Sequence, residues 1–326
     1  MRRLAVGVET WPIAGRFVIA RGAVTEITVV TIGIAEAGRI GRGECRPYAR
    51  YGEAPETVIA EIEAQRAAIE AGLDRRELQS RMEPGAARNA IDCALWDLAA
   101  KQSGKRVWEL AGLPAPRPVE TAFTISVGTP SEMAAATRKA SDRTLLKVKL
   151  AGHGDLERIE AVREAAPASR LIVDANEAWT AATYRDLAPR MSALGVALIE
   201  QPLPVDDDTA LGMLPHPVPL CADESVHDRK GLEALARRYD AINIKLDKTG
   251  GLTEAIALAR AARGLGLTIM VGCMVATSLA MAPALLLASE AAFVDLDGPL
   301  LLARDREPGL TYEGSLVMPP PPELWG

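Results

Sequence analysis

The run Leu145-Leu146-Lys147-Val148-Lys149 is one of eight short apolar segments, most of them closed by a polar residue, that decide the fold. The eight segments recur at regular intervals along the second part of the chain, at Ala122–Ser126, Leu145–Lys149, Leu171–Asp174, Ala197–Glu200, Leu220–Asp223, Ile242–Lys245, Ile269–Gly272 and Ala292–Asp295. Aliphatic and β-branched runs of this length are typical of buried strands. We therefore expect eight strands in this part of the chain.

The segments between these strands favour helices. They are rich in Ala, Leu, Glu and Arg and have helical periodicity, as in Leu156–Ala165 and Leu252–Arg263. Strands that alternate with helices predict right-handed βαβ units and a parallel sheet. Eight such units, with no glycine-rich phosphate-binding turn after any strand, favour a closed (β/α)₈ barrel of the TIM type over an open doubly wound sheet. Leu267–Ala288 is uncharged and long enough for a bilayer, but its Gly272 and Pro283 favour a buried strand, a turn and a helix.

The chain divides into three parts. We expect residues 1–115 to form a separate α+β unit, residues 116–303 the barrel, and the proline-rich residues 304–326 a tail that packs back on the first unit. In the first unit the pattern predicts strands at Ala5–Glu9, Phe17–Ala20 and Ile27–Ile34 and helices at Pro55–Ala71 and Ala86–Lys101. Two loops of this unit, Gly15–Thr25 and Arg46–Glu53, carry exposed polar residues.

Charge and cysteine content narrow the class of partner. The 326 residues include 37 Lys and Arg against 43 Asp and Glu, for a net charge of -6, and no Lys/Arg block. Nucleic acids and anionic membranes need concentrated positive charge, so we expect a small-molecule ligand and neither of these partners. The four cysteines form no CxxC pair, and no export signal is visible at the start of the chain. We expect a cytoplasmic protein.

Three carboxylates close consecutive strands of the predicted barrel. Asp174, Glu200 and Asp223 end the third, fourth and fifth runs. Barrel active sites lie at the carboxyl ends of the strands, so these side chains should meet at one rim. Three oxygen donors suit a hard divalent cation that keeps open positions, and Mg²⁺ is the natural candidate. The three histidines form no paired ligand motif, so zinc is not expected.

Two lysines flank these carboxylates. Lys149 ends the second run and Lys245 the sixth, which places them on opposite sides of an eight-strand ring. This arrangement suits proton removal next to a carboxylate and return of the proton on the opposite face, with inversion. The metal ion and Lys147 should each destabilise the ammonium form of the base. Taken singly, each group has an ordinary alternative, a solvated lysine pair or a helix N-cap, and we expect only supporting or capping roles for Asn176, Glu224, Asp247 and Lys248.

The strand-end motifs resemble those of a known family. The muconate-lactonizing-enzyme subgroup of the enolase superfamily is similar at Leu146-Lys147-Val148-Lys149, Val173-Asp174-Ala175-Asn176, Ile199-Glu200-Gln201-Pro202, Ala222-Asp223-Glu224-Ser225, Asn243-Ile244-Lys245 and Thr249-Gly250-Gly251. The resemblance implies that Asp174, Glu200 and Asp223 bind Mg²⁺, that Lys149 and Lys245 are the acid/base pair, and that Lys147 steadies the substrate carboxylate. It also implies that the first unit is a capping domain whose two loops set specificity.

A narrower resemblance indicates a substrate class. Asp295-Leu296-Asp297-Gly298 resembles the element with which dipeptide epimerases hold the α-ammonium group, and Arg50-Tyr51-Gly52-Glu53, Ala87-Arg88-Asn89-Ala90, Asp247-Lys248-Thr249 and Gly272-Cys273-Met274 resemble the proteobacterial L-Ala-D/L-Glu epimerases. Those enzymes recycle cell-wall peptide. A glutamyl side chain needs a cation, for which Arg21 and Arg50 are the candidates. Thr124 and Met274 are further expected substrate contacts.

Other functions are compatible with the same barrel. One alternative is a lyase or cycloisomerase, similar to o-succinylbenzoate synthase or to the muconate enzymes, whose substrates carry no ammonium group for Asp295 and Asp297. A second is a barrel that only binds a carboxylate ligand, which would not need two lysines. A metal hydrolase would need histidine ligands. The sequence leaves open a homo-oligomer, Mn²⁺ in place of Mg²⁺, and which lysine serves which enantiomer.

Overall fold

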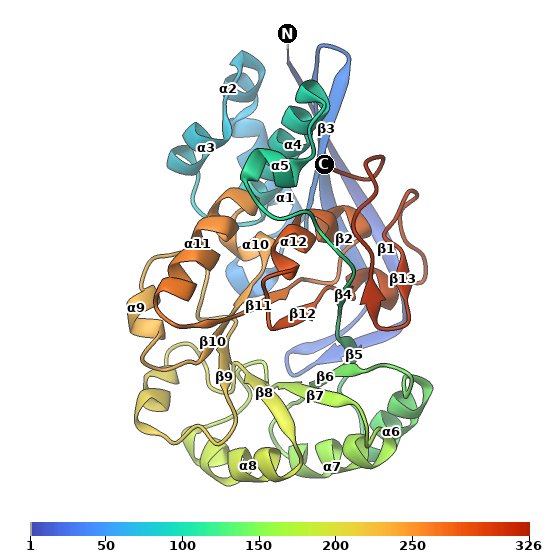
Figure 1. Cartoon of the computed structure of the whole chain (residues 1–326), viewed down its shortest axis with the longest axis vertical. Coiled ribbons are helices and arrows are strands. Elements are labelled where there is room, and N and C mark those ends of the chain that lie inside the picture. The colour runs from blue at the N-terminus through green and yellow to red at the C-terminus, as the bar shows by residue number, and fades with distance from the viewer. Residues whose placement is uncertain (1) are drawn as a thin grey trace.

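The expected barrel strands form one sheet of eight parallel strands in the computed structural model, which describes residues 2–326 (Figure 1). They pair in chain order as β5 (Phe123–Ile125), β6 (Leu145–Lys149), β7 (Arg170–Asp174), β8 (Val196–Glu200), β9 (Leu220–Ala222), β10 (Ala241–Ile244), β11 (Thr268–Gly272) and β12 (Phe293–Asp295). A hydrogen bond from the Ala122 amide to the Val294 carbonyl (2.8 Å) joins the last strand to the first. The prediction of a TIM-type barrel is confirmed.

Side chains inside the barrel lie in layers because alternate residues of each strand point inward. At the amino ends the layer is apolar and consists of a buried cluster of Ala122, Leu145, Ile172, Leu198, Cys221, Ala241 and Met270. Two residues further along β6 and β7, the inward positions hold Lys147 and Asp174, which are also buried. The apolar layer thus closes the bottom of the barrel and leaves charged groups only at the carboxyl ends.

Helices cover the outside of the barrel unevenly. Regular helices follow five of the strands, as α6 (Pro130–Lys139), α7 (Asp155–Ala165), α8 (Ala181–Ala193), α11 (Leu252–Gly264, after the short α10, Leu246–Thr249) and α12 (Ser278–Ala288). Only the 3₁₀ turn η2 (Asp208–Met213) follows β8, the four-residue α9 (Leu232–Leu235) follows β9, and η3 (Gly298–Leu301) follows β12. Prolines at 202, 204, 215, 217 and 219 lack the amide hydrogens that a helix between β8 and β9 would need.

The apolar segment Leu267–Ala288 folds as predicted into a strand, a turn and a helix, β11 and α12. Pro283 lies inside α12, and the helix is buried along nearly its whole length. None of the helices in residues 2–326 combines the length and the apolar character needed to cross a membrane.

The first unit is an antiparallel sheet of β1 (Arg3–Ile19), β2 (Gly22–Glu36) and β3 (Arg39–Cys45). The two strands expected at Ala5–Glu9 and Phe17–Ala20 are wrong as separate elements, because both belong to β1, which continues through a register irregularity between Pro12 and Phe17. The expected loop Gly15–Thr25 is therefore mostly strand, and only its tip is a turn.

Helices pack on one face of this sheet and extend beyond the two that were expected. They are α1 (Pro55–Ala64), α2 (Arg66–Ala71), α3 (Arg75–Arg81), α4 (Ala86–Ser103) and α5 (Val107–Ala111), with the 3₁₀ turn η1 (Ala49–Tyr51) before them. The strand β3 was not expected because it is rich in glycine. Its Gly41 and Gly43 let α4 approach closely, since a Cβ at either position would lie 2.1 Å from a carbonyl oxygen of α4.

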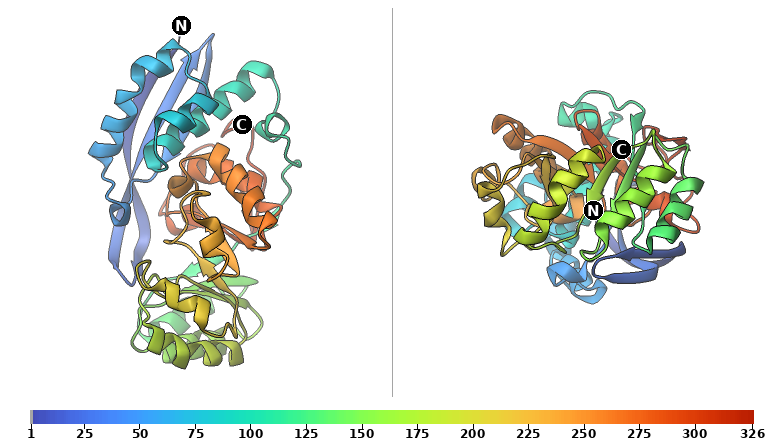
Figure 2. Two further views of the ribbon diagram at one scale, coloured as in Figure 1. Left: turned by 90° about the vertical axis from the view of Figure 1, so that its left-hand side faces the viewer. Right: turned by 90° about the horizontal axis from the view of Figure 1, so that it is seen from below.

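The first unit and the tail both touch the barrel. The long β1–β2 hairpin reaches from the sheet down to the barrel (Figure 1 and Figure 2, left), and Val18 exchanges hydrogen bonds with the segment after β5. In the tail, β13 (Tyr312–Glu313) and β14 (Leu316–Val317) form a small sheet with β4 (Val119–Glu120). At its end, the Trp325 indole donates to the Cys93 carbonyl of α4 (3.1 Å). The tail therefore contacts both parts of the molecule.

Candidate active site

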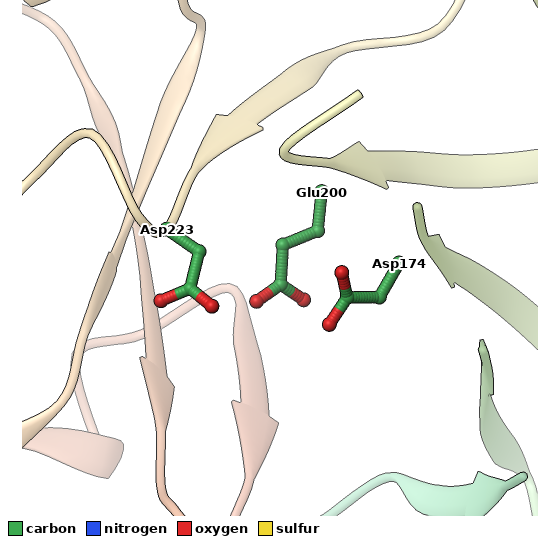
Figure 3. A group of neighbouring side chains, drawn as sticks. All are labelled: Asp174, Glu200 and Asp223. Carbon is green, nitrogen blue, oxygen red and sulfur yellow. The ribbon is translucent and has the colours of Figure 1, made fainter. Parts of the chain in front are cut away.

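Three carboxylates meet where β7, β8 and β9 end. Asp174 and Glu200 are the last residues of β7 and β8, and Asp223 directly follows β9. Each offers an oxygen that lies within 4.8 Å of the others, with Glu200 between the two aspartates (Figure 3). All three side chains are buried, and Glu200 Oε2 accepts no well-aligned hydrogen bond although Lys147 Nζ is 2.7 Å away. This donor set fits a hard divalent cation such as Mg²⁺.

Four lysines surround these carboxylates. Lys147 Nζ lies 2.7 Å from Glu200, 3.2 Å from Asp174 and 2.7 Å from Asp295. Lys149 and Lys245 contact opposite ends of the triad, Asp174 at 2.6 Å and Asp223 at 2.7 Å respectively. The fourth is Lys248, whose Nζ lies 2.5 Å from Asp223 Oδ1. With Asp295 counted, four ammonium groups balance four carboxylates, which explains how so many charges can be buried together.

Burial and neighbouring charges shift the pKa values of Lys245 and Lys248 in ways that the sequence did not reveal. Burial has the largest effect on the pKa of Lys245 and lowers it, and Lys147 lowers it too as expected. Asp223 and Glu200 act together in the opposite direction and hold that pKa well above its usual value. In Lys248, by contrast, burial outweighs Asp223 and the pKa falls. Burial and the neighbouring Asp174 raise the pKa of Glu200 to about 7. The expected effect of Lys147 on Lys245 is thus present, but the neighbouring carboxylates act against it.

Unusual backbone geometry places the residues that follow the metal-ligand candidates. Asn176, Glu177 and Gln201 all have positive φ, at 45°, 68° and 34°. Side chains other than glycine adopt this region rarely, so the surroundings must enforce it. Gln201 Oε1 accepts from the amides of Asp223 (2.9 Å) and Ser225 (3.2 Å), which fixes the turn that carries Asp223.

Three residues with polar contacts to the triad carried no clear sequence signal. Lys248 follows a strand in a pattern that favoured a capping role, yet it is fully buried and its Nζ also contacts the Asp223 and Asn243 carbonyl oxygens. Asn243 Nδ2 donates to Glu200 Oε1 (2.8 Å) from inside β10. Gln201 contacts the triad through the backbone amide of Asp223, which donates to Gln201 Oε1. Asn176 and Glu224 do lie beside the triad, and the Asn176 amide nitrogen donates to Asp174 Oδ1 (2.9 Å).

A cavity of about 770 Å³ lies over the triad and is bounded by both units. The barrel contributes Lys149, Lys245, Asp223 and Thr124 to its lining, and the β11–α12 connection contributes Met274. The β1–β2 hairpin and the segment 46–55 form the rest of the wall. Arg46 and Tyr51 line it there, and the sequence analysis gave them no individual role within the loop Arg46–Glu53. Both candidate bases and one of the metal-ligand candidates, Asp223, thus line one cavity.

Asp295 and Asp297 enter the same cavity from the end of β12. Asp295 is 4% exposed; its Oδ2 contacts Lys147, and its Oδ1 has no hydrogen-bond partner in the described chain. Asp297 Oδ2 accepts from the Thr124 amide (2.7 Å), so Thr124 positions Asp297 through its backbone. Burial and the neighbouring Asp295 raise the pKa of Asp297 to about 7. The two carboxylates offer acceptor atoms to a cationic ligand group.

The two arginine candidates occupy different positions. Arg21, at the hairpin tip, donates to Glu224 (2.8 Å), to the Asn176 carbonyl (3.0 Å) and to Tyr48 (3.3 Å). Arg50 forms a two-point ion pair with Glu177, with both N···O distances 2.8 Å. Both arginines line the cavity. The structure therefore brings all the predicted site residues to one place.

Comparisons with known proteins agree with this geometry. Residues 1–112 match the mandelate racemase/muconate lactonizing enzyme N-terminal domain, and residues 131–314 match the enolase C-terminal domain-like family. The L-Ala-D/L-Glu epimerase of Escherichia coli K12 is 50% identical over 96% of this chain and 98% of its own length.

Solved structures give the same result. An enolase family member from Agrobacterium tumefaciens with homology to dipeptide epimerases, with bound sodium and L-Ala-L-Glu, is 54% identical with a TM-score of 0.98 over 100% of both chains. A dipeptide epimerase from Methylococcus capsulatus, complexed with Mg and L-Arg-D-Lys, is 31% identical with a TM-score of 0.90, covering 97% of this chain and 96% of that one. The predicted resemblance is confirmed: this chain belongs to the mandelate racemase/muconate lactonizing enzyme family of the enolase superfamily.

Proposed function

We propose that the protein is a Mg²⁺-dependent dipeptide epimerase, an isomerase that inverts the α-carbon of the C-terminal residue, with L-Ala-L-Glu and L-Ala-D-Glu as its substrate pair. The observation that carries this proposal is the placement of Lys149 and Lys245 at opposite ends of a buried carboxylate triad, with both lysines lining one cavity. The similarity to the Escherichia coli epimerase and to the Agrobacterium protein with bound L-Ala-L-Glu supports the substrate class.

The triad Asp174, Glu200 and Asp223 would hold the metal ion. When bound, Mg²⁺ supplies a Lewis acid that stabilises negative charge on the substrate carboxylate as the α-proton leaves. The Methylococcus dipeptide epimerase with Mg supports this choice of ion. The remaining steps depend on side chains of the chain itself.

Proton transfer falls to the two lysines. The neutral amine of one lysine takes the α-proton, and the C–H electron pair moves into the carboxylate to give an enolate. The ammonium of the other lysine donates a proton to the opposite face, so the configuration inverts and the substrate is neither oxidised nor reduced. Lys147 lies beside the triad and would hold the substrate carboxylate by charge. Because either lysine can begin the step, the reaction runs in both directions.

The two ends of the dipeptide would be held by separate groups. Asp295 and Asp297 accept hydrogen bonds from the α-ammonium group, since Asp295 Oδ1 is buried and has no hydrogen-bond partner in residues 2–326. Arg21, at the rim of the cavity, pairs with the glutamyl carboxylate. Holding both ends fixes the α-carbon between the lysines, and such positioning supplies much of the catalytic effect. Met274 lines the wall of the same cavity.

The alternatives on the same barrel fit less well. Substrates of a lyase or cycloisomerase carry no ammonium group, and a buried carboxylate oxygen that faces such a substrate would stay unpaired at a cost in free energy. Loss of catalysis with retained ligand binding would leave no role for a base at each end of the triad. The proposed place of the reaction is the recycling of cell-wall peptide in the cytoplasm.

Proton NMR in D₂O tests the proposal. L-Ala-L-Glu is incubated with the protein and Mg²⁺, and the glutamyl α-proton and the diastereomer are followed over time. We expect loss of the α-proton signal, growth of L-Ala-D-Glu, and abolition of both by EDTA. The absence of exchange with any member of a dipeptide panel at saturating Mg²⁺ would discard the epimerase and bring the lyase forward.

A further inference from the structure

Glu177 lies at the rim of the barrel, three residues beyond the metal-ligand candidate Asp174. Its φ of 68° is in the left-handed region, and it follows Asn176, whose φ is 45°. The Glu177 amide donates to the Gln201 carbonyl (2.9 Å), which ties this turn to the neighbouring strand end. Because such a backbone conformation persists only where the surroundings hold it, the direction of the Glu177 side chain is fixed by the barrel.

The Glu177 carboxylate joins three separate segments. From the segment after β3, Arg50 donates to both of its oxygens at 2.8 Å. From the β1–β2 hairpin tip, Arg21 Nη1 lies 3.3 Å from Oε2, and from the segment after β8 the Val205 amide donates to Oε1 (3.1 Å). The Glu177 side chain is 10% exposed, against 38% for Arg50 and 27% for Arg21. A single carboxylate of the barrel thus contacts both the hairpin tip and the segment around Arg50.

We propose that Glu177 is a positioning residue that closes the hairpin tip and the segment around Arg50 over the cavity, and that Arg50 serves this closure and not the substrate. Arg50 directs its Nε and Nη2 hydrogens at the two Glu177 oxygens, a two-point geometry that offsets much of its charge. Arg21 is held differently.

The different roles of Arg21 and Arg50 follow from their different partners. Arg21 has its shorter contact with Glu224 (2.8 Å) and only a longer one with Glu177 (3.3 Å). It forms a two-point pair with neither carboxylate, so we assign the substrate carboxylate to Arg21, while Glu177 keeps Arg50. This part rests on the proposed function, because it assumes a dipeptide with an acidic side chain, whereas the closure itself does not.

Hydrogen exchange of the free protein tests the closure without any substrate. Amide exchange is compared in the wild type, Glu177→Gln, Arg50→Met and the double variant, with Glu164→Gln at an exposed position of α7 as the matched control. Glutamine keeps an acceptor for Val205 but loses the charge. We expect exchange to rise about tenfold in residues 20–24 and 48–52 of Glu177→Gln and in residues 48–52 of Arg50→Met. The double variant should be no faster than Glu177→Gln.

Two outcomes would overturn the closure: unchanged exchange in those residues in both single variants, or faster exchange spread equally into the barrel strands, which would indicate general destabilisation. Arg50→Met keeps the test valid if Glu177→Gln does not fold. The control variant should exchange like the wild type.

Kinetics test the assignment of the arginines. In Arg50→Met and Glu177→Gln we expect KM to rise about equally for L-Ala-L-Glu and for L-Ala-L-Leu with kcat little changed, and non-additive effects in the double variant. Arg21→Met should lose activity only toward the glutamyl substrate. A loss confined to the glutamyl substrate in Arg50→Met would overturn the proposal. If the wild type acts on no dipeptide, the proposed function fails while the exchange experiment still decides the closure.

Discussion

Replacing Asp295 with asparagine tests how the amino end of the substrate is held. The side chain is 4% exposed, and its Oδ1 has no hydrogen-bond partner in residues 2–326, so it is an acceptor ready for a cation. A hydrogen bond to a charged group contributes about 1.5–3 kcal/mol, so we expect kcat/KM for L-Ala-L-Glu to fall about 10- to 150-fold. Asparagine has nearly the same volume, so packing is preserved.

The assay compares two substrates in the same variant. The rate of α-proton loss is measured by NMR for L-Ala-L-Glu and for N-acetyl-L-Ala-L-Glu, which lacks the ammonium group. The ratio of kcat/KM for the free over the acetylated dipeptide should drop in the variant. An equal loss of kcat/KM on both substrates would contradict a contact between Asp295 and the ammonium group. It would instead indicate that Asp295 acts through its contact with Lys147 (2.7 Å).

Three more predictions concern the same site. Because the pKa of Asp297 is raised to about 7, kcat/KM for L-Ala-L-Glu should rise from about pH 6 to about pH 8 as this carboxyl ionises, and Asp297→Asn should flatten that rise in a pH–rate profile. Gly272→Ala should weaken Mg²⁺ binding measured by calorimetry, because the new Cβ would lie 2.5 Å from Asn243 Oδ1 and displace the side-chain amide that orients Glu200. Gly264→Ala should leave Mg²⁺ binding unchanged, because a Cβ at that position would have no other atom within 4 Å. Mg²⁺ at about 100 times its Kd should raise the free energy of urea unfolding by about 2.7 kcal/mol, and Glu200→Gln should remove this gain.

The barrel strands could be predicted because their signal is local. The bounds Leu145–Lys149 agree with β6, which is buried along its whole length and has apolar residues at 145, 146 and 148. β3 was not predicted because the glycines that allow α4 to approach closely weaken the strand pattern in its sequence. β1 was split because Pro12 and Gly15 interrupt its alternation, although the strand continues past them.

The candidate site was predictable as far as it lies on strand ends. The rule that barrel sites gather at carboxyl ends brings Asp174, Glu200 and Asp223 together without knowledge of distances. The partners of Lys248 and Arg50 could not be predicted, because burial depth and loop contacts depend on tertiary structure. The sequence could propose Arg50 as a cation for the substrate, but only the fold shows its two-point contact with Glu177.

The raised pKa of Lys245 could not be predicted from the sequence either. The lysine and its partner Asp223 lie on adjacent strands, and the sequence indicated only that both are near the rim. Their 2.7 Å contact decides that Asp223 stabilises the ammonium form. Electrostatic balance in a buried cluster depends on distances of this order, which no motif contains.

In the proposed mechanism, two lysines act on opposite faces of the same substrate α-carbon. The most direct measurement follows deuterium entry at the glutamyl α-carbon of L-Ala-L-Glu and of L-Ala-D-Glu, separately, in Lys149→Gln and in Lys245→Gln. We expect that neither variant interconverts the epimers, and that each still exchanges the α-proton of one epimer, a different one for each variant. Continued epimerisation in either variant, or exchange of the same epimer in both, would contradict it.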